Sequence, residues 1–449
     1  MHRYDEAIET LGRDVLAYAR ERLMFDPAPL DAPRPAAELQ AMVGETITEH
    51  GLGPDVLDLF TEKLAPACIS TDHPRYLSFI PCAPTEAATL FDLVVGASSI
   101  YAGTWLEGAG AVFAENQALR WLAGLAGFPD EAGGVFVPGG TIGNLSALVS
   151  AREAARRAHP GPPPDRWRVL AGAQAHSSIA SACQVMDVEL VLVEEDGQGR
   201  LTGDALRRTF ADGGGDGVVA VVATAGTTNL GIVDDLASVA DVCTELGVWL
   251  HVDGAYGLAA MAAPELRPIF DGIERADSFV VDPHKWLFAP FDSCALVYRD
   301  PARARAAHTQ RAGYLDVVTE TEDFNPSDHA IGLTRRARGL PFWFSLAMHG
   351  TEAYARAVRQ TVDVARYAAA QIRSRDGLTL VRDPDLSVVV FRREGWSAGD
   401  YHAWSQDLLG RGHAFIVPTV HDGETLARFA VVNPRTTHED IDGILDTMR

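Results

Sequence analysis

The sequence predicts an α/β protein whose large domain is built on a mainly parallel β-sheet and is followed by a smaller α+β domain. From Val135 onward, short apolar runs without alternation are each followed by a polar or glycine turn and a helical stretch, a pattern typical of parallel strands covered by helices on both faces. After Ala330 the order changes to long helices and then shorter strands. The 449 residues, 47% hydrophobic and 22% charged, suffice for a large core divided into two or three units.

The first segment, residues 1–65, is predicted to be helical, with a proline-rich joint from Pro27 to Pro35. Its apolar residues form one narrow stripe at Ile8, Leu11, Val15 and Leu16. Because so narrow a stripe cannot enclose a core of its own, we expect it to cover another surface.

We expect the large domain to span residues 66–335. After a strand at Val135, its predicted strands are Val169–Ala171, Val188–Val193, Val218–Ala223, Val248–Val252, Phe279–Val281 and Ala295–Tyr298. Ligands of open parallel sheets bind beyond the carboxyl ends of the strands. The residues directly after these runs are therefore the candidates for a functional site.

The last domain is expected to span residues 336–449 and to begin with a long helical region, Phe342 to Ile372. Shorter elements follow: strands at Val388–Phe391, Phe415–Val417 and Phe429–Val432, and helices at Tyr401–Leu409 and Glu439–Met448. This mixture predicts a small α+β domain.

Composition and charge exclude several classes of function. With 38 basic and 61 acidic residues, the net charge of −23 disfavours nucleic acid and anionic membranes as partners. The five cysteines lack the paired spacing of a zinc site or a redox dithiol, so we expect no metal and reduced thiols. The N-terminus does not resemble a secretory signal, and no apolar stretch approaches the roughly 20 residues of a membrane span. We therefore expect a cytoplasmic enzyme that acts on a small molecule.

The most informative residue is Lys285, in the run Asp282-Pro283-His284-Lys285-Trp286 directly after a predicted strand. Lysine is rarely buried without a partner. An amine in this setting is suited to forming a Schiff base. For a single lysine, a stem lying along the surface with the ammonium in water is the ordinary alternative.

Asp253 ends another predicted strand, in His251-Val252-Asp253-Gly254-Ala255. Alone it is equally compatible with a helix cap or a turn. Beside a Schiff-base lysine, its carboxylate suits the ring nitrogen of pyridoxal phosphate, which must stay protonated to accept electrons. A unit charge 4 Å away contributes about 4 kcal/mol at an effective dielectric constant near 20. The small methyl group of Ala255 would let a flat ring lie against it.

Three further motifs follow predicted strands. Pro138-Gly139-Gly140-Thr141 leads into a helix, whose N-terminus can bind phosphate through free N–H groups, although an ordinary tight turn has the same sequence. His176 could stack on a flat cofactor, although an isolated histidine there is more often a helix-start residue. Thr227 and Thr228 could donate hydrogen bonds to a cofactor or substrate.

In this order, the motifs PGGTIGN, AHSS, ATAGTT, HVDGAYG and DPHKW resemble those of the group II pyridoxal-phosphate decarboxylases, whose best-known branch is the aromatic-L-amino-acid decarboxylases. The resemblance covers nearly the whole chain. It implies the aspartate-aminotransferase-like fold (fold type I), with a seven-stranded, mainly parallel sheet in the cofactor-binding domain. It also implies a homodimer with active sites at the interface, in which the N-terminal apolar stripe would pack on the partner.

By matching position, the resemblance implies that Lys285 binds pyridoxal phosphate covalently, that Asp253 pairs with the pyridine nitrogen and that His176 stacks on the ring. The other expected cofactor contacts are Gly140, Thr141, Thr228, Ala255 and His284, and the expected substrate contacts are Tyr76, Phe79, Pro81 and Trp105.

Two positions depart from the family pattern. Asp282 stands where some members have asparagine, and a carboxylate beside a phosphate dianion is unfavourable, so Asp282 is not assigned as a ligand. Gly254 replaces a common alanine, and we expect this change to have no effect.

The stretch between His308 and His329 is polar and irregular, and loops this long are usually functional or disordered. Within it, Gly313-Tyr314-Leu315 resembles the family's lid motif, whose tyrosine protonates the carbanion after carbon dioxide leaves, here directly or through His176. An ordinary exposed tyrosine is the alternative. Branches that produce aldehydes carry phenylalanine at this position, so Tyr314 favours simple decarboxylation.

The sequence thus predicts decarboxylation of an L-amino acid to the amine. An aromatic substrate is favoured because Tyr76, Phe79 and Trp105 lie in segments expected near the pocket, while Arg75 leaves an acidic substrate open. Oxidative deamination to an aldehyde, retro-aldol cleavage and transamination are alternative outcomes with the same cofactor. A non-catalytic scaffold is the remaining alternative, and the presence of both Lys285 and Asp253 disfavours it.

Overall fold

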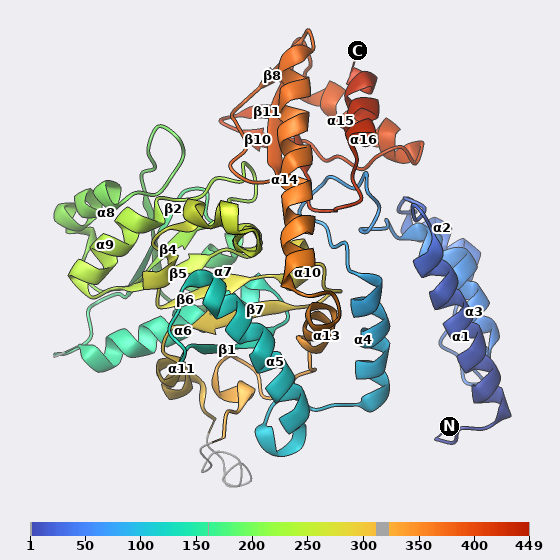
Figure 1. Cartoon of the computed structure of the whole chain (residues 1–449), viewed down its shortest axis with the longest axis horizontal. Coiled ribbons are helices and arrows are strands. Elements are labelled where there is room, and N and C mark those ends of the chain that lie inside the picture. The colour runs from blue at the N-terminus through green and yellow to red at the C-terminus, as the bar shows by residue number, and fades with distance from the viewer. Residues whose placement is uncertain (1, 160, 311–322, 449) are drawn as a thin grey trace.

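The computed structural model describes residues 2–159, 161–310 and 323–448, and Figure 1 shows its arrangement. At its centre is a seven-stranded sheet with the strand order β1-β7-β6-β5-β4-β2-β3. The strands are β1 (Gly133–Val137), β2 (Arg168–Gly172), β3 (Glu189–Val193), β4 (Val218–Thr224), β5 (Trp249–Asp253), β6 (Ser278–Val281) and β7 (Cys294–Tyr298). Neighbouring strands from β3 to β6 are parallel, whereas β7 runs antiparallel to β6 and to β1. The predicted α/β fold with a mainly parallel seven-stranded sheet is confirmed.

Both faces of this sheet are covered by helices, because successive residues of each strand belong to different apolar clusters. Val221 of β4 faces one cluster and Val222 faces the other, and both are fully buried. The helices of the first layer include α5 (Trp105–Ala126), α8 (Gly203–Thr209) and α9 (Leu236–Leu246), and those of the second include α6 (Gly140–Ala158), α7 (Ser177–Met186) and α11 (Pro301–His308). Burial on both sides explains why the strands appear in the sequence as continuous apolar runs.

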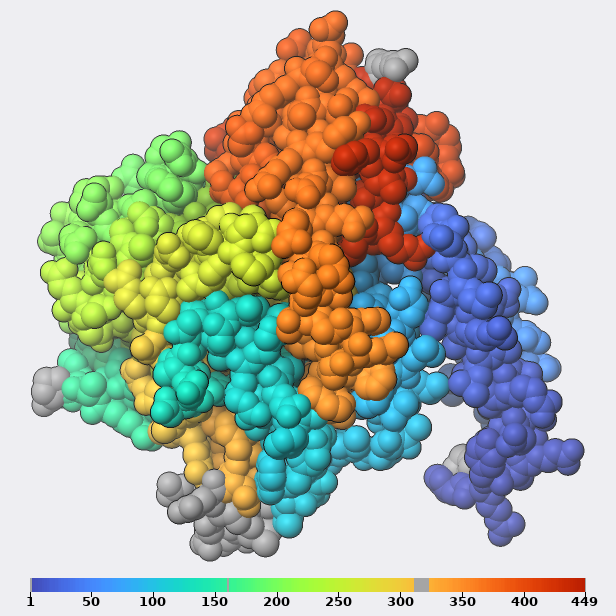
Figure 2. Space-filling view, viewed as in Figure 1, coloured from blue at the N-terminus to red at the C-terminus, as the bar shows by residue number. Residues whose placement is uncertain are grey.

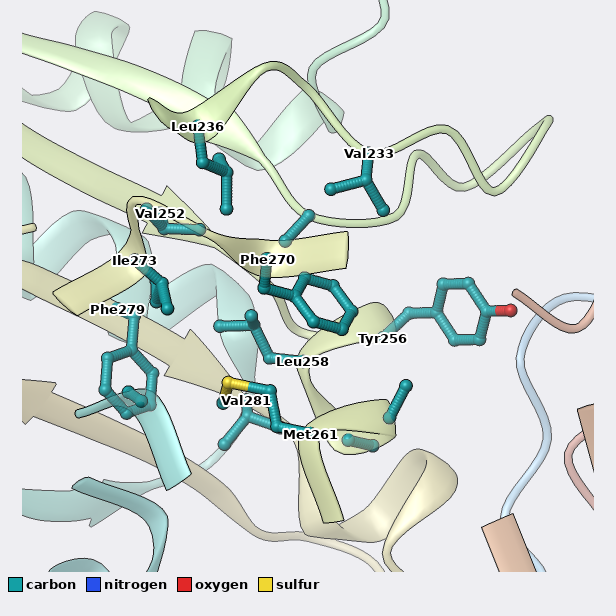
Figure 3. Packing of buried hydrophobic residues seen from close by; sticks show 14 of the residues in the cluster. Val233, Leu236, Val252, Tyr256, Leu258, Met261, Phe270, Ile273, Phe279 and Val281 are labelled. Carbon is teal, nitrogen blue, oxygen red and sulfur yellow. The ribbon is translucent and has the colours of Figure 1, made fainter. Parts of the chain in front are cut away.

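Figure 3 shows part of the first cluster, close to the carboxyl end of β5. Leu258 and Met261, from the short helical segment after β5, belong to the same buried cluster as Phe279 and Val281 of β6. Each of these four side chains is at most 1% exposed. This packing fixes the chain directly after Asp253, the residue that ends β5.

The C-terminal part contains a four-stranded antiparallel sheet with the order β10-β11-β9-β8. Its strands are β8 (Leu378–Leu380), β9 (Val388–Arg393), β10 (Thr419–His421) and β11 (Glu424–Ala430). The helices that share its apolar cluster are α14 (Thr351–Ser374), α15 (Ala398–Gly410) and α16 (His438–Leu445). Figure 1 shows these elements gathered beyond one edge of the large sheet.

The predicted helical region from Phe342 to Ile372 is two helices. α13 (Leu340–His349) ends at Gly350, and α14 begins directly after it. The break occurs there because Gly350 has a φ of 76°, a backbone conformation that favours glycine and cannot continue a right-handed helix.

Two predicted strands of the C-terminal part also differ in the structure. Phe415–Val417 is extended but pairs outside the small sheet, since the backbone N–H of Leu77 donates to the carbonyl of Phe415 at 3.0 Å. Of the strand predicted at Phe429–Val432, only Phe429 and Ala430 belong to β11, which starts earlier, at Glu424, and ends at Ala430. An apolar run marks an extended segment but does not identify its pairing partner.

At the N-terminus, α1 (Glu6–Met24), α2 (Ala36–Val43) and α3 (Asp55–Leu59) project from the body of the molecule, as Figures 1 and 2 show. No residue of α1 is buried. The stripe residues Ile8, Val15 and Leu16 are 38%, 37% and 55% exposed. On the following helix, α4 (Glu86–Ser98), Leu90, Leu93 and Val94 are about half exposed. None of the helices in the described part of the chain combines the length and the apolar composition needed to cross a membrane.

Candidate active site

The carboxyl ends of β4, β5 and β6 and the start of α6 surround a cavity of about 370 Å³. The structure brings nine of the residues proposed from the sequence to the wall of this cavity. They are Phe79, Gly140, Thr141, His176, Thr228, Asp253, Ala255, His284 and Lys285. They come from segments far apart in the chain, which the sheet order brings together at one edge.

Three further proposed residues, Tyr76, Pro81 and Trp105, are not among those lining the cavity. Tyr76 is only 8% exposed and packs edge-on against Phe415, with ring centroids 4.9 Å apart. Pro81 is buried. Trp105 starts α5, where its backbone N–H donates to the side chain of Asn325 at 2.9 Å. Tyr314 lies outside the described residues.

The start of α6 has the features of an anion site. Gly139, directly before the helix, has a φ of 154°, and the first N–H groups of a helix have no acceptor within it. A Cβ on Gly140 would lie 3.2 Å from the Cβ of Ala255 and 3.4 Å from Oδ2 of Asp282, so a side chain there would occupy the cavity. With the hydroxyl of Thr141 and the positive end of a 19-residue helix, this position can hold a phosphate group.

Lys285 lies in the four-residue helix α10 (Pro283–Trp286) after β6, and its Nζ is 2.8 Å from Oδ2 of Asp282. Burial alone would lower the pKa of this ammonium, but the neighbouring groups, chiefly the carboxylate of Asp282 and then that of Asp253, together outweigh burial, and the pKa is raised. In turn, burial alone would raise the pKa of Asp282, but Lys285 and His284 hold it below its ordinary value. The lysine is therefore held as the cation of an ion pair.

Asp282 is 1% exposed, and its Oδ1 has no hydrogen-bond partner among the described residues. Its Oδ2 is also 3.6 Å from Nε2 of His284. Burial lowers the pKa of His284, whose Nδ1 lies 2.7 Å from the carbonyl oxygen of Ser293. Asp282, which sequence reasoning left unassigned, is thus the direct partner of Lys285 and lies at the anion site.

Asp253 and His176 reach the cavity from two different layers of the fold. Asp253 is 5% exposed, its Oδ2 accepts from Nδ2 of Asn144 at 2.9 Å, and its Oδ1 accepts from the backbone N–H of Ala255 at 3.2 Å. His176 caps α7, where its Nδ1 accepts from the backbone N–H of Ser178 at 3.2 Å. Its ring is exposed and lines the cavity. The carboxylate is therefore oriented by two donors, and the imidazole is held by the start of a helix.

Sequence reasoning missed Arg428, which is 4% exposed and joins two segments of the cavity wall. Its guanidinium donates to the carbonyl oxygens of Thr228, Asn229 and Phe79, at 2.6, 3.2 and 2.9 Å. Phe79 has a φ of 51°, so this arginine holds a residue in a left-handed conformation that few side chains adopt. An arginine inside the apolar run of β11 is the sequence signal that would have identified it.

A second missed signal is the choice of basic residues. Of the 38 basic residues, 36 are arginines and two are lysines, Lys63 and Lys285. A guanidinium is always charged, whereas an amine can lose its proton and act as a nucleophile. A chain that uses arginine almost everywhere else therefore makes the lysine at position 285 stand out.

Comparison with known proteins gives the reaction class that the sequence motifs predict. Residues 38–394 match the model of the pyridoxal-dependent decarboxylase conserved domain. The chain is 30% identical over 418 residues to an aromatic-L-amino-acid decarboxylase of Bacillus atrophaeus, covering 90% of this chain and 86% of that protein. It is also 30% identical over 401 residues to an L-2,4-diaminobutyrate decarboxylase of Rhizobium meliloti (strain 1021), covering 84% and 77%. The crystal structure of Oryza sativa TDC with PLP and tryptamine has a TM-score of 0.91 at 25% identity, covering 100% and 99% of the two chains.

The cavity also fits pyridoxal phosphate on its own geometry. The helix start at Gly140 suits the phosphate, the amine of Lys285 suits the aldehyde, and the carboxylate of Asp253 suits the ring nitrogen. The one unfavourable group is Asp282, and its charge is offset by the ammonium of Lys285.

Proposed function

Because the chain belongs to the pyridoxal-dependent decarboxylase family, and is thus a pyridoxal-phosphate-dependent carboxy-lyase acting on amino acids, we propose that it converts an aromatic L-amino acid to the amine and carbon dioxide. The observation that supports an aromatic side chain is the position of Arg75. This candidate for binding an acidic substrate lies 3.8 Å from Asp440 and 3.3 Å from His413, and it is not among the residues lining the cavity. Phe79, 59% exposed, and Ile80 supply apolar surface there instead.

Bound pyridoxal phosphate supplies an electron-accepting ring that stabilises the electron pair left on the substrate when carbon dioxide departs. The first turn of α6, with Thr141 and His284, would hold the phosphate group. The carboxylate of Asp253 would keep a proton on the ring nitrogen, and Lys285 would provide the amine for covalent attachment. His176 would cover one face of the ring. The remaining contacts to the cofactor would come from Ala255, Gly140 and Thr228.

We propose that Tyr314, outside the described residues, returns the proton to the substrate carbon. Tyr314→Phe should leave cofactor affinity within about twofold, lower amine formation about a hundredfold or more, and raise the share of aldehyde, because a general acid contributes about 10²–10⁴-fold. Amine and aldehyde would be quantified from the same reaction. Tyr4→Phe, which changes a tyrosine that is 75% exposed, is the matched control. Unchanged amine formation would remove the role of Tyr314.

The substrate is tested by incubating the holoenzyme with L-tryptophan, L-tyrosine, L-phenylalanine, L-histidine, L-2,4-diaminobutyrate and L-glutamate. Amine, aldehyde, peroxide and carbon dioxide would be measured for each. We expect kcat/KM to be highest for an aromatic amino acid. A higher value for diaminobutyrate or glutamate would overturn the substrate assignment, and peroxide formed in step with carbon dioxide would overturn simple decarboxylation.

We also propose that the active form is a homodimer with active sites at the interface. The exposed apolar residues of α1 and α4 support this, because a single chain leaves them facing water. The exposed ring of Phe79 beside the cavity supports it as well. Sedimentation at micromolar concentration should show a dimer, and a species of 48.2 kDa would contradict it.

A further inference from the structure

Behind Asp253, the wall of the cavity contains a continuous set of buried polar side chains, here called the Asn144 network. Its members are Asn144, Ser178, His251, Ser278 and Trp249, each at most 3% exposed. They come from α6, α7, β5 and β6, so one helix layer and the central sheet contribute to one hydrogen-bond chain. Its two ends on the cavity side are Asp253 and His176.

The amide of Asn144 can lie in only one orientation. Its Nδ2 is 2.9 Å from Oδ2 of Asp253 and 2.9 Å from Oγ of Ser178. An ionised carboxylate accepts but does not donate, so the amide nitrogen must face Asp253. The amide oxygen then faces Nε2 of His251 at 2.9 Å, and that ring nitrogen must carry the proton.

The far end of the network requires the same assignment. The indole N–H of Trp249 donates to Oγ of Ser278 at 2.9 Å, which leaves the hydroxyl proton of Ser278 for Nδ1 of His251, also at 2.9 Å. Burial lowers the pKa of His251 to about 4, so its ring is neutral at neutral pH. His251 therefore accepts at Nδ1 and donates at Nε2, and this holds Asn144 in place.

Besides Asp253, the amide of Asn144 also reaches His176, through a hydrogen bond to Ser178. Because Oγ of Ser178 accepts from Asn144, its own proton points to Nδ1 of His176, 2.9 Å away. The backbone N–H of Ser178 also donates to this nitrogen, at 3.2 Å. Two donors face Nδ1, so the proton of the neutral imidazole lies on Nε2, the nitrogen free of α7.

Resting on the roles proposed above for Asp253 and His176, we propose that Asn144 is a positioning residue that fixes both groups at once. Its amide donates directly to the acid that would pair with the ring nitrogen. Through Ser178, the same amide fixes the orientation and tautomer of the imidazole that would cover the ring. Variants of Asn144 should therefore weaken cofactor binding, whereas variants of Ser178 should lower kcat without weakening it.

The hydrogen bond from Asn144 to Asp253 is tested with Asn144→Asp. This variant keeps the size of the side chain but replaces the donor facing Asp253 by a second acceptor. Two carboxyl groups in contact cannot both ionise, so Asp253 loses its fixed charge state. We expect the dissociation constant of pyridoxal phosphate, measured on apo protein without substrate, to rise at least about tenfold. Asn433→Asp is the matched control, because Asn433 is 2% exposed and donates to the carbonyl of Asp72, away from the cavity.

The connection from Asn144 through Ser178 to His176 is tested with Ser178→Ala, which leaves the hydrogen bond between Asn144 and Asp253 intact. Cofactor affinity should stay within about twofold, while kcat with the best substrate falls about tenfold at an unchanged KM. Ser178→Thr, which keeps the hydroxyl, should restore kcat. A purely structural role would lower thermal stability without this separation.

Two outcomes would overturn the role of Asn144. One is cofactor affinity within twofold of wild type in Asn144→Asp, with a loss of thermal stability like that of Asn433→Asp. The other is a ¹⁵N spectrum of the histidine-labelled apo protein that places the proton of His251 on Nδ1. If Asn144→Asp does not fold, Asn144→Ser is judged by the same affinity threshold. These readouts do not depend on which amino acid is the substrate, so they can fail independently of the proposed reaction.

Discussion

At the scale of single residues, the contact between Asp282 and Lys285 determines how readily the amine can react. An amine attacks an aldehyde only without its proton, yet the carboxylate 2.8 Å away raises the pKa of Lys285. The same carboxylate lies beside the helix start that would hold the phosphate. Asp282 therefore opposes both covalent attachment and anion binding as long as it remains charged.

Asp282→Asn removes this charge with almost no change of shape. Burial, which lowers the pKa of Lys285, then acts without the strongest interaction that opposed it, so the pKa of Lys285 falls. At pH 8 more of the amine is free, and modification of Lys285 in apo protein by an amine-reactive reagent should increase several-fold. Peptide mass spectrometry measures this, with Lys63, the other lysine of the chain, as internal control. Equal or slower modification would contradict the role of Asp282.

The site residues that could be predicted from the sequence are those that carry chemistry by themselves. Lys285, Asp253 and His176 each follow an apolar run, and strand ends meet at one edge of a parallel sheet. The partner of Asp253 could not be found this way, because Asn144 is 109 positions away and its contact depends on how α6 packs on β5. For Asp282, the turn of α10 decides whether the carboxylate faces the lysine, and no sequence pattern specifies that rotation.

At the scale of elements, the turn after β5 shows that the glycine at position 254 has a structural role. The sequence alone indicated that this replacement of alanine has no effect. In the structure, a Cβ on Gly254 would lie 2.0 Å from Cγ of Leu258, which is buried in the cluster shown in Figure 3. The structure argues against this expectation, because the space that a methyl group would need is filled by a leucine four residues later.

Gly254→Ala should therefore destabilise the protein by about 1–3 kcal/mol, the usual cost of overpacking a buried site. The displaced turn adjoins Asp253, so cofactor affinity should fall as well. Urea unfolding and cofactor titration measure the two effects. In the double variant Gly254→Ala with Leu258→Ala, the two free energies should not add, because the second change removes the two closest atoms, Cγ and Cδ1 of Leu258, and leaves only its Cβ at 2.7 Å. If the free energy of unfolding of Gly254→Ala equals that of the wild type, Leu258 moves aside without cost.

Elements were predictable where burial leaves a pattern in the sequence. Except for the edge strand β3, the strands of the large sheet are buried on both faces, and their apolar runs locate them within one or two residues. Phe415–Val417 has the same pattern but pairs near Leu77, more than 300 positions away. Pairing over that distance depends on the complete fold, so a local pattern cannot specify it.

At the scale of the whole molecule, three buried histidines in separate regions make stability depend on pH. Burial lowers the pKa values of His73, His251 and His329 to about 4. In the unfolded chain a histidine has a pKa near 6.5. Above pH 6.5 both states are neutral and the contribution to stability is complete. As the pH falls from 6.5 toward 4, the unfolded chain gains protons that the native chain does not, and stability is lost.

Each such histidine adds a slope of up to about 1.4 kcal/mol per pH unit in this range. Burial raises the pKa of Asp234 to about 7, which gives an opposite slope, so the histidine contribution is measured as a difference between two variants. The free energy of unfolding of the wild type minus that of His329→Gln, measured with urea at pH 8, 7, 6 and 5, should be constant above about pH 6.5 and decrease below it. His402→Gln, at an exposed position, is the control, and its difference from the wild type should stay constant. A difference between wild type and His329→Gln that is the same at pH 7 and pH 5 would contradict this account.

The pairing of β1 with β7 has a consequence for how the protein is made. Gly133 pairs with Tyr298 and Val137 with Cys294, so the strand that leads into Gly140 joins its neighbour only after the segment carrying Lys285 has been synthesised. A nascent chain on the ribosome therefore has an incomplete vitamin-binding edge until translation has passed residue 298. Capture of vitamin B6 is consequently a late event in biosynthesis, and prematurely terminated chains should not sequester it from the cell.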